Sequence, residues 1–336
     1  MMIPDSQPSR ASKFPAVHDD ELLYSIVARY GVLAGNIDAQ STNLDLFGRA
    51  FGHAGTHLPA NLQSMADRLP ASLTLSGRDL VQRHTLLPYQ CAFLPHEAME
   101  RTIAAALADG GRRGRPAGSA DRPLPRPRNL RFCYPCVEQM LRDRQDLHWK
   151  RVHQLAVVTV CPKHECDLLE SAVSPGPHDT RLHPPTLAVC DAGQPSVIPS
   201  GTNVDRAALA ELARDAAMLL RGEYPAGLER RSGPDYAQMF RDLGYGGRAR
   251  LDWTIMEPAI RTALADISPA MPGVTSAANR RRGWFVELMS ERHPGHTDRV
   301  LIAAFVLRRI ESVAPRFWAA LDEITGRPLL LLKDVA

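Results

Sequence analysis

Three cysteines and one histidine form two short motifs in the middle of the chain. They are Cys133-Tyr-Pro-Cys136 and, 24 residues further on, Cys161-Pro-Lys-His164. Two residues separate the members of each pair, a spacing that lets one tight turn present both side chains to a single ion. Three thiolates and one imidazole are a closed, soft ligand set, typical of a structural Zn²⁺ site. The spacing therefore predicts one structural zinc ion held by these four side chains.

The same residues allow other interpretations. The cysteines can be ordinary buried thiols, or Glu165 beside His164 can serve a catalytic zinc, although a fourth protein ligand argues against that chemistry. A redox Cys-x-x-Cys site is less favoured because a second ligand pair is present and no thioredoxin-like pattern surrounds the motif. Cys166 lies two residues beyond His164 and can compete as a ligand, whereas Cys91 and Cys190 look like ordinary thiols.

The segment between the ligand pairs, residues 147–155, combines apolar and basic side chains. Trp149 and Leu155 are expected to pack against the metal motifs, and His148 and His153 are expected in the core. Lys150 and Arg151 can reach a phosphate or lie on a solvated face, and the sequence does not decide between these two alternatives.

Composition narrows the class of protein. The chain has 336 residues, of which 44% are hydrophobic, and this predicts two or three folded domains. No apolar run reaches the ~18–20 residues of a membrane span, and the first residues lack the apolar stretch of a secretory signal, which predicts a cytoplasmic protein. No phosphate-binding GxxxxGK[ST] motif, nucleophile elbow or spaced acidic triad is present, so we expect no enzymatic activity.

Helical periodicity surrounds the predicted metal segment on both sides. The fold class we predict is mainly α, with an N-terminal helical, helix-turn-helix-like domain at 14–110 and an Arg/Pro-rich linker at 111–128. A zinc-finger module at 129–170 follows, and then a C-terminal helical domain with helix-turn-helix-like elements at 201–336. Asp19 and Asp20 are expected to cap the first helix, and Gly35 to end it. The predicted helices are 21–33, 43–51, 59–69, 76–85 and 95–109, then 205–220, 236–243, 253–266, 279–292 and 297–311.

Several stretches of this sequence resemble the TniQ/TnsD family of transposon target-selection proteins. The resemblance rests on Arg131–Cys136, Trp149–Leu155 and Cys161–His164, and in the N-terminal part on Asp20–Ser25, Ala28–Tyr30, Gly35-Asn36, Arg83–Tyr89 and Phe93–Pro95. It covers about residues 14–170 and is weaker from 205 to 311. The chain departs from the family pattern at Lys150, Ala156, Val157 and Glu165, none of which is a ligand.

The resemblance implies a non-enzymatic protein that selects the site where a transposon inserts. Family members bind double-stranded DNA at an attachment site and recruit the AAA+ ATPase TnsC, which brings the transposase. Others dock on a CRISPR RNA-guided effector complex, and a zinc-containing transcription regulator is a further alternative. A bacterial, cytoplasmic and nucleoid-associated location follows from any of these roles. Since TnsD-type proteins usually continue with further helical modules, the sequence is also consistent with a truncated chain.

Clustered arginines give DNA binding independent support, because phosphate contacts need cations. The balance of 40 Lys and Arg against 37 Asp and Glu is too even to indicate it alone. Clusters occur at 112–128, 142–151, 228–250 and 280–282. The side chains predicted to contact DNA are Lys150, Arg151, Arg248, Arg250, Arg280, Arg281 and Arg282.

Overall fold

The computed structural model describes residues 13–50, 60–108, 124–175, 181–225, 233–247, 250–271, 273–274, 283–290 and 296–325. Helices dominate these residues, and the one two-stranded sheet among them pairs β1 (Arg131–Phe132) with β2 (Leu169–Glu170) in antiparallel register. This confirms the predicted mainly α fold with a central Cys/His cluster. The helix-turn-helix character of its parts stays a prediction.

Six short helices build the N-terminal region: α1 (Leu23–Ala34), α2 (Ala39–Phe47), α3 (Leu62–Arg68), α4 (Gly77–His84), α5 (Leu87–Cys91) and α6 (His96–Leu107). Glycine fixes the α1–α2 corner. Gly35 ends α1 with φ of 74°, as predicted, and a Cβ on Gly31 would lie 2.7 Å from the Thr42 hydroxyl. The two helices therefore approach closely only because position 31 lacks a side chain.

Some predicted helix boundaries in this region are wrong. Asp19 and Asp20 do not cap α1, whose N-cap is Leu22 without a side-chain hydrogen bond. The second helix begins at Ala39 instead of residue 43, because Asp38 accepts a hydrogen bond from the Ser41 amide. Helix α5 was not predicted at all, since it has only five residues and carries a proline in its first turn.

The metal segment follows, with α7 (Tyr134–Arg142) and the 3₁₀ turn η1 (Val152–Gln154). Beyond it the C-terminal region comprises α8 (Arg206–Leu220), α9 (Gly233–Asp242), α10 (Trp253–Leu264), the turn η2 (Ser268–Ala270), α11 (Trp284–Ser290) and α12 (Thr297–Thr325). The Asp205 carboxylate caps α8, as predicted for this helix. The last helix runs fourteen residues beyond its predicted end at 311.

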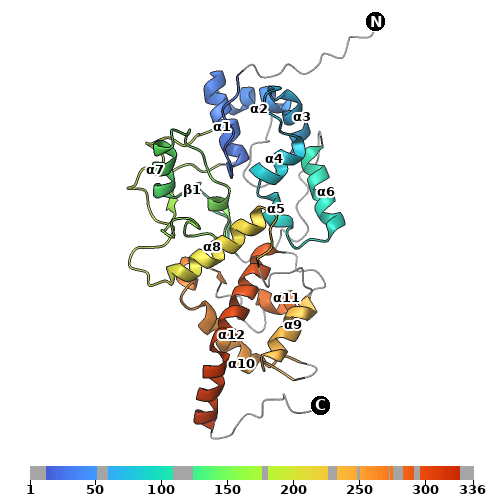
Figure 1. Ribbon diagram of the computed structural model, residues 1–336, viewed down its shortest axis with the longest axis vertical. Helices are drawn as coiled ribbons and strands as arrows, with labels where there is room; N and C mark the ends of the chain where they lie inside the picture. Colours follow the sequence, from blue (N-terminus) through green and yellow to red (C-terminus); the bar gives the residue numbers. More distant parts are fainter. Residues whose placement is uncertain are drawn as a thin grey trace.

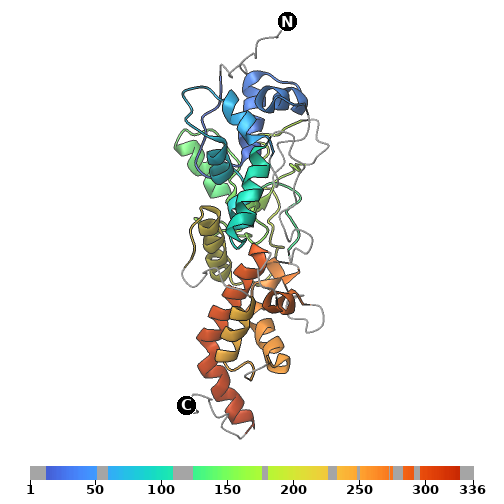
Figure 2. The same cartoon turned by 90° about the vertical axis from the view of Figure 1, so that its right-hand side faces the viewer.

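The molecule is elongated, with the two helical regions at opposite ends (Figure 1). Helix α8 crosses the middle, where it contacts α5, η1 and α12, while α12 runs along the C-terminal end (Figures 1 and 2). Ion pairs from Arg308 to Asp215 and from Arg309 to Asp205 join α12 to α8. In the described part of the chain, no helix is both long enough and apolar enough to cross a bilayer.

Candidate metal centre

The two ligand pairs are carried by different local structures. Cys133 is the N-cap residue of α7, and Cys136 lies in its first turn, where Pro135 is tolerated because no helical hydrogen bond is lost. Cys161 and His164 lie in a tight hairpin whose base is the Val160–Asp167 bridge. The β1–β2 pairing brings the two segments together, because β1 ends immediately before Cys133 and β2 begins three residues after Cys166.

The four predicted ligands converge on one point. The His164 Nδ1 atom lies 3.3 Å from the sulfurs of Cys133 and Cys136 and 3.7 Å from that of Cys161, and the sulfurs of Cys136 and Cys161 are 3.8 Å apart. Zinc bonds of about 2.3 Å to sulfur and 2.0–2.1 Å to nitrogen place tetrahedral ligand atoms about 3.5–3.8 Å apart. The three cysteines are buried and His164 is half-buried. This Cys₃His group has the donor set, spacing and burial that a tetrahedral metal site needs.

Close contacts between the sulfurs shift the pKa values of these thiols in opposite directions. Hydrogen bonds from Cys133 and Cys136 lower the pKa of the Cys161 thiol. The same close contacts, to Cys136 first and then Cys161, raise the pKa of Cys133. A divalent cation would displace the thiol protons, because only thiolates bind it.

The side chains around the cluster are held mostly as the sequence predicts. Trp149 is buried, packs edge-on against Phe132 and donates from its indole to the His183 carbonyl at 3.2 Å. His148 and His153 are both buried. The half-buried Lys150 lines a cavity of about 160 Å³ together with Cys136 and Cys161, so a cationic side chain shares this cavity with two of the ligand residues.

The segment between the ligand pairs is tied to the N-terminal region through its backbone. The Leu22 amide donates to the Trp149 carbonyl and the Arg151 amide to the Asp20 carbonyl, each at 2.8 Å. The Trp149 amide in turn donates to the Ser25 hydroxyl at 3.1 Å. We call residues 147–154 the strap, since they fasten the metal cluster to the start of α1. Sequence periodicity gave no signal for it, because its bonds are isolated and not part of a regular ladder.

Arg151 belongs to this strap and not to the surface. It is 3% exposed, and its guanidinium donates to the Gln82 and Thr85 carbonyls and to the Asp20 carboxylate. A phosphate cannot reach a guanidinium that is enclosed and engaged in this way, so the structure does not offer Arg151 for the DNA contact predicted for it.

A buried ion pair lies directly beneath the strap. Arg29 binds the Glu21 carboxylate at 2.8 Å, and Glu21 is completely buried and also accepts from the Ser25 hydroxyl. Arg29 additionally bonds Asp146, the residue that precedes the strap. Sequence reasoning missed these polar contacts, because Glu21 precedes α1 and lies eight residues from Arg29, a separation that marks no helical ion pair.

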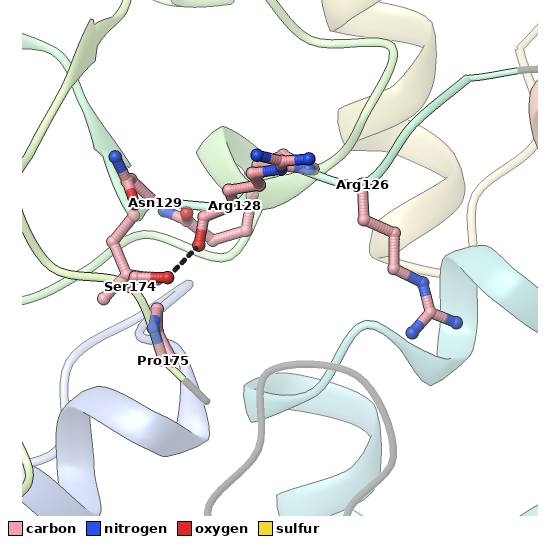
Figure 3. Close-up of a pocket in the computed structure, with 8 residues that line it drawn as sticks. Arg126, Arg128, Asn129, Ser174 and Pro175 are labelled. Atoms are coloured by element: carbon pink, nitrogen blue, oxygen red, sulfur yellow. Dashed lines mark hydrogen bonds between the residues drawn. The ribbon is translucent and has the colours of Figure 1, made fainter. Parts of the chain in front are cut away.

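Of the remaining predicted DNA contacts, the structure describes only Arg250. Arg250 is exposed in the connection between α9 and α10, whereas Arg248 and Arg280–282 lie outside the described residues. The structure describes the end of the predicted arginine-rich linker. Its residues Arg126 and Arg128 line an open groove of about 280 Å³, together with Asn129 and Ser174 from outside the linker (Figure 3). The Ser174 hydroxyl donates to the Arg128 carbonyl at 3.1 Å, and none of the eight lining residues is acidic.

Comparison with known protein families gives a match that includes the metal cluster and the strap. The TniQ family model matches residues 13–168, which hold α1 to α7, the strap and all four ligands. We call residues 13–168 the TniQ region, because they match this family model, and they make up a little under half of the chain. The transposon Tn7 transposition protein TnsD of Escherichia coli is 27% identical over 152 residues, which are 45% of this chain and 30% of that protein. The chain thus matches less than a third of this relative's length, and the C-terminal region from α8 onward lies outside the TniQ match.

The TniQ match explains why the metal ligands and the α1 segment occur in one unit. The matched residues include both segments that the strap hydrogen bonds join, Asp20–Ser25 and residues 147–154. The TniQ region is therefore a helical bundle and a Cys/His module joined through buried backbone and charged contacts.

Proposed function

We propose that this chain is a non-enzymatic target-site selector of a transposon. It binds double-stranded attachment-site DNA and recruits the AAA+ regulator TnsC, and through it the transposase. The observation that carries this proposal is the TniQ match over residues 13–168, supported by the similarity of 152 residues of the chain to a Tn7 transposition protein.

The metal in the Cys₃His group is, on this proposal, one structural Zn²⁺. Zinc has no geometric preference from d electrons and is held by such sets in closed four-coordinate sites. All four positions are filled by protein atoms, so the ion has no free position for water and acts by fixing α7 against the Cys161–His164 hairpin. Metal analysis of the purified protein tests this, with one zinc per chain expected.

DNA binding would use exposed cations outside the metal cluster. Arg128 and Arg250 are exposed, and the groove of Arg126 and Arg128 has donors on several sides and no acidic lining residue. Of the other side chains that the sequence predicts to contact DNA, Lys150 is half-buried and Arg151 is buried, whereas Arg248 and Arg280–282 lie outside the described residues. Arginine forks suit phosphate oxygens, so these side chains fit contacts to the DNA backbone rather than to base edges.

A salt titration of DNA binding tests these contacts. Each phosphate contact contributes a slope of about −0.9 in log K against log salt concentration. Arg128→Ala and Arg250→Ala should each lower the affinity for DNA and reduce the magnitude of that slope by about 0.9, the contribution of one phosphate contact. Arg261→Ala is the matched control, because it removes the same unit of charge from an exposed arginine already paired with Glu257 at 2.9 Å. Equal slopes for all three variants would remove these arginines from the interface.

The α1–α2 hairpin is our candidate for the ATPase contact. Of the seven large hydrophobic side chains that are exposed in the described part of the chain, four lie in this hairpin: Val32, Leu33, Ile37 and Leu44. Ile37 is 84% exposed. Clustered exposed apolar side chains mark interaction surfaces more often than isolated ones.

Retention of the cognate ATPase on immobilised protein, with and without target duplex, tests recruitment. Ile37→Asp should abolish retention while leaving DNA binding intact. Leu187→Asp is the matched control, since Leu187 is 59% exposed and lies elsewhere in the chain. Site-specific DNA binding without any ATPase retention by the unaltered chain would contradict the proposal and indicate a transcription regulator. Retention of the ATPase that requires an RNA-guided complex would indicate a protein that docks on a CRISPR effector complex.

A further inference from the structure

A fourth sulfur lies beside the Cys₃His group. The Cys166 Sγ atom is 3.5 Å from that of Cys133, and Cys166 is half-buried whereas the other five cysteines are buried. The two remaining thiols, Cys91 and Cys190, have no hydrogen-bond contact with a ligand sulfur in the described structure. Cys166 is thus distinguished from them by its contact with the ligand set.

The hairpin that carries Cys161 and His164 also fixes Cys166. The Cys161 amide donates to the Cys166 carbonyl and the Glu165 amide to the Cys161 carbonyl, each at 2.8 Å. Glu165 has a φ of 53°, which reverses the chain between His164 and Cys166. This left-handed turn, which glycine adopts more readily, keeps the Cys166 side chain beside the ligands.

We propose that Cys166 is a reserve metal ligand that takes the place of Cys133. The distance between their sulfurs, 3.5 Å, is close to the ~3.8 Å edge of a tetrahedral thiolate site. To take the place of Cys133, the Cys166 sulfur has to move by no more than the 3.5 Å that separates the two atoms, while Cys136, Cys161 and His164 keep their positions. The ligand set stays Cys₃His, and the Cys166 thiol gives its proton to solvent as it binds the divalent ion.

The proposal predicts that the two cysteines of the first motif differ when replaced. Cys133 has a spare thiol next to it, whereas the described contacts of the Cys136 sulfur are with other ligands, Cys161 and His164. Cys133→Ser should therefore retain one metal ion per chain, with weaker affinity, while Cys136→Ser should lose the ion. Cys133→Ser/Cys166→Ser should lose it as Cys136→Ser does, and Cys166→Ser alone should match the unaltered chain.

Zinc content and zinc affinity against a competing chelator measure this difference in the full-length protein. Cobalt substitution gives a second readout, because the sulfur-to-cobalt absorption reports the number of bound thiolates. Cys133→Ser should keep the three-thiolate intensity. Cys133→Ser/Cys190→Ser is the matched control and should behave like Cys133→Ser, since Cys190 is a buried thiol without a contact to a ligand sulfur.

The outcomes separate this inference from the assignment of zinc. No metal in the unaltered chain contradicts the zinc site itself. Metal in the unaltered chain, with Cys133→Ser as deficient as Cys136→Ser, overturns only the reserve-ligand role, whether the variant misfolds or stays folded. Retention in Cys133→Ser that survives the additional Cys166→Ser change also overturns it. Protection of Cys166 from alkylation in zinc-loaded Cys133→Ser, but not in the unaltered chain, is the positive result.

Discussion

The TniQ region and the C-terminal region are held together by different forces. Of the seventeen polar or charged side chains buried in the described structure, fourteen lie between Glu21 and Ser171 and the other three at the start of α12. The core of α8 to α11 is apolar, with Leu212, Phe240 and Ile260 fully buried. Buried polar groups cost free energy unless every partner is in place, so the first region tolerates fewer arrangements than the second.

This difference matches what each region must do on the proposed function. The TniQ region has to hold the two ligand pairs and the α1–α2 hairpin in a fixed position relative to each other. The hydrogen bonds of the strap are directional and stabilise this arrangement. Helices α8 to α11 pack mainly through non-directional apolar contacts, and half-buried ion pairs of Arg308 and Arg309 join α12 to α8. The variants below should therefore act differently in the two regions.

Removal of the metal should have the largest effect. Structural zinc contributes on the order of 10 kcal/mol to the folding of its module, and the strap transmits the loss to α1. Chelation or Cys136→Ser should therefore abolish hydrogen-exchange protection in α1 and α7 together. Helices α10 and α12 should keep theirs, because their buried contacts do not involve the strap. Uniform loss along the whole chain would mean that the two regions unfold as one.

The buried ion pair should be the next most sensitive feature. Arg29→Met leaves the fully buried Glu21 carboxylate without its cation, and such a loss costs about 3–5 kcal/mol. Denaturant unfolding of the zinc-loaded protein measures it. Glu21→Gln/Arg29→Met removes both charges and should recover most of the loss. If the double variant is no more stable than Arg29→Met, the charge of Glu21 is not the cause.

Acid should weaken the TniQ region through His84. Burial lowers the pKa of this histidine from 6.5 to about 4, although a hydrogen bond to the Glu21 carbonyl opposes the shift. Above pH 6.5 the His84 imidazole is neutral in both the folded and the unfolded state. Between pH 6.5 and about 4 only the unfolded state binds the proton, so the free energy of unfolding falls by up to about 1.4 kcal/mol per pH unit.

The matched measurement compares the unaltered chain with His84→Asn at pH 7.5, 6.5 and 5.5. Protonation of the metal ligands affects both proteins equally and cancels in the difference. The stability gap between them should narrow, or reverse in favour of His84→Asn, as the pH falls. Parallel curves would show that His84 takes up no proton on unfolding.

The sequence predicted the parts of this molecule that depend on local pattern. Ligand spacing identified all four members of the cluster, Gly35 the end of α1, and Asp205 the start of α8. It did not predict the strap, because the Leu22–Trp149 bond joins residues far apart and no periodicity marks it. For the same reason Arg151 looked like a surface cation, since a sequence does not reveal that two carbonyls and a carboxylate enclose its guanidinium.

The smallest effect should come from a conservative change in the apolar region. Leu212 on α8 is fully buried. Leu212→Met keeps nearly the same side-chain volume and adds no polar group, so it should lower the free energy of unfolding by less than about 1.5 kcal/mol. The same substituent at position 29 should cost at least twice as much, although both sites are buried. Methionine thus serves as a common probe, because it fills space without supplying directional bonds. If denaturant unfolding gives equal losses at positions 29 and 212, packing volume and not the polar network stabilises the TniQ region.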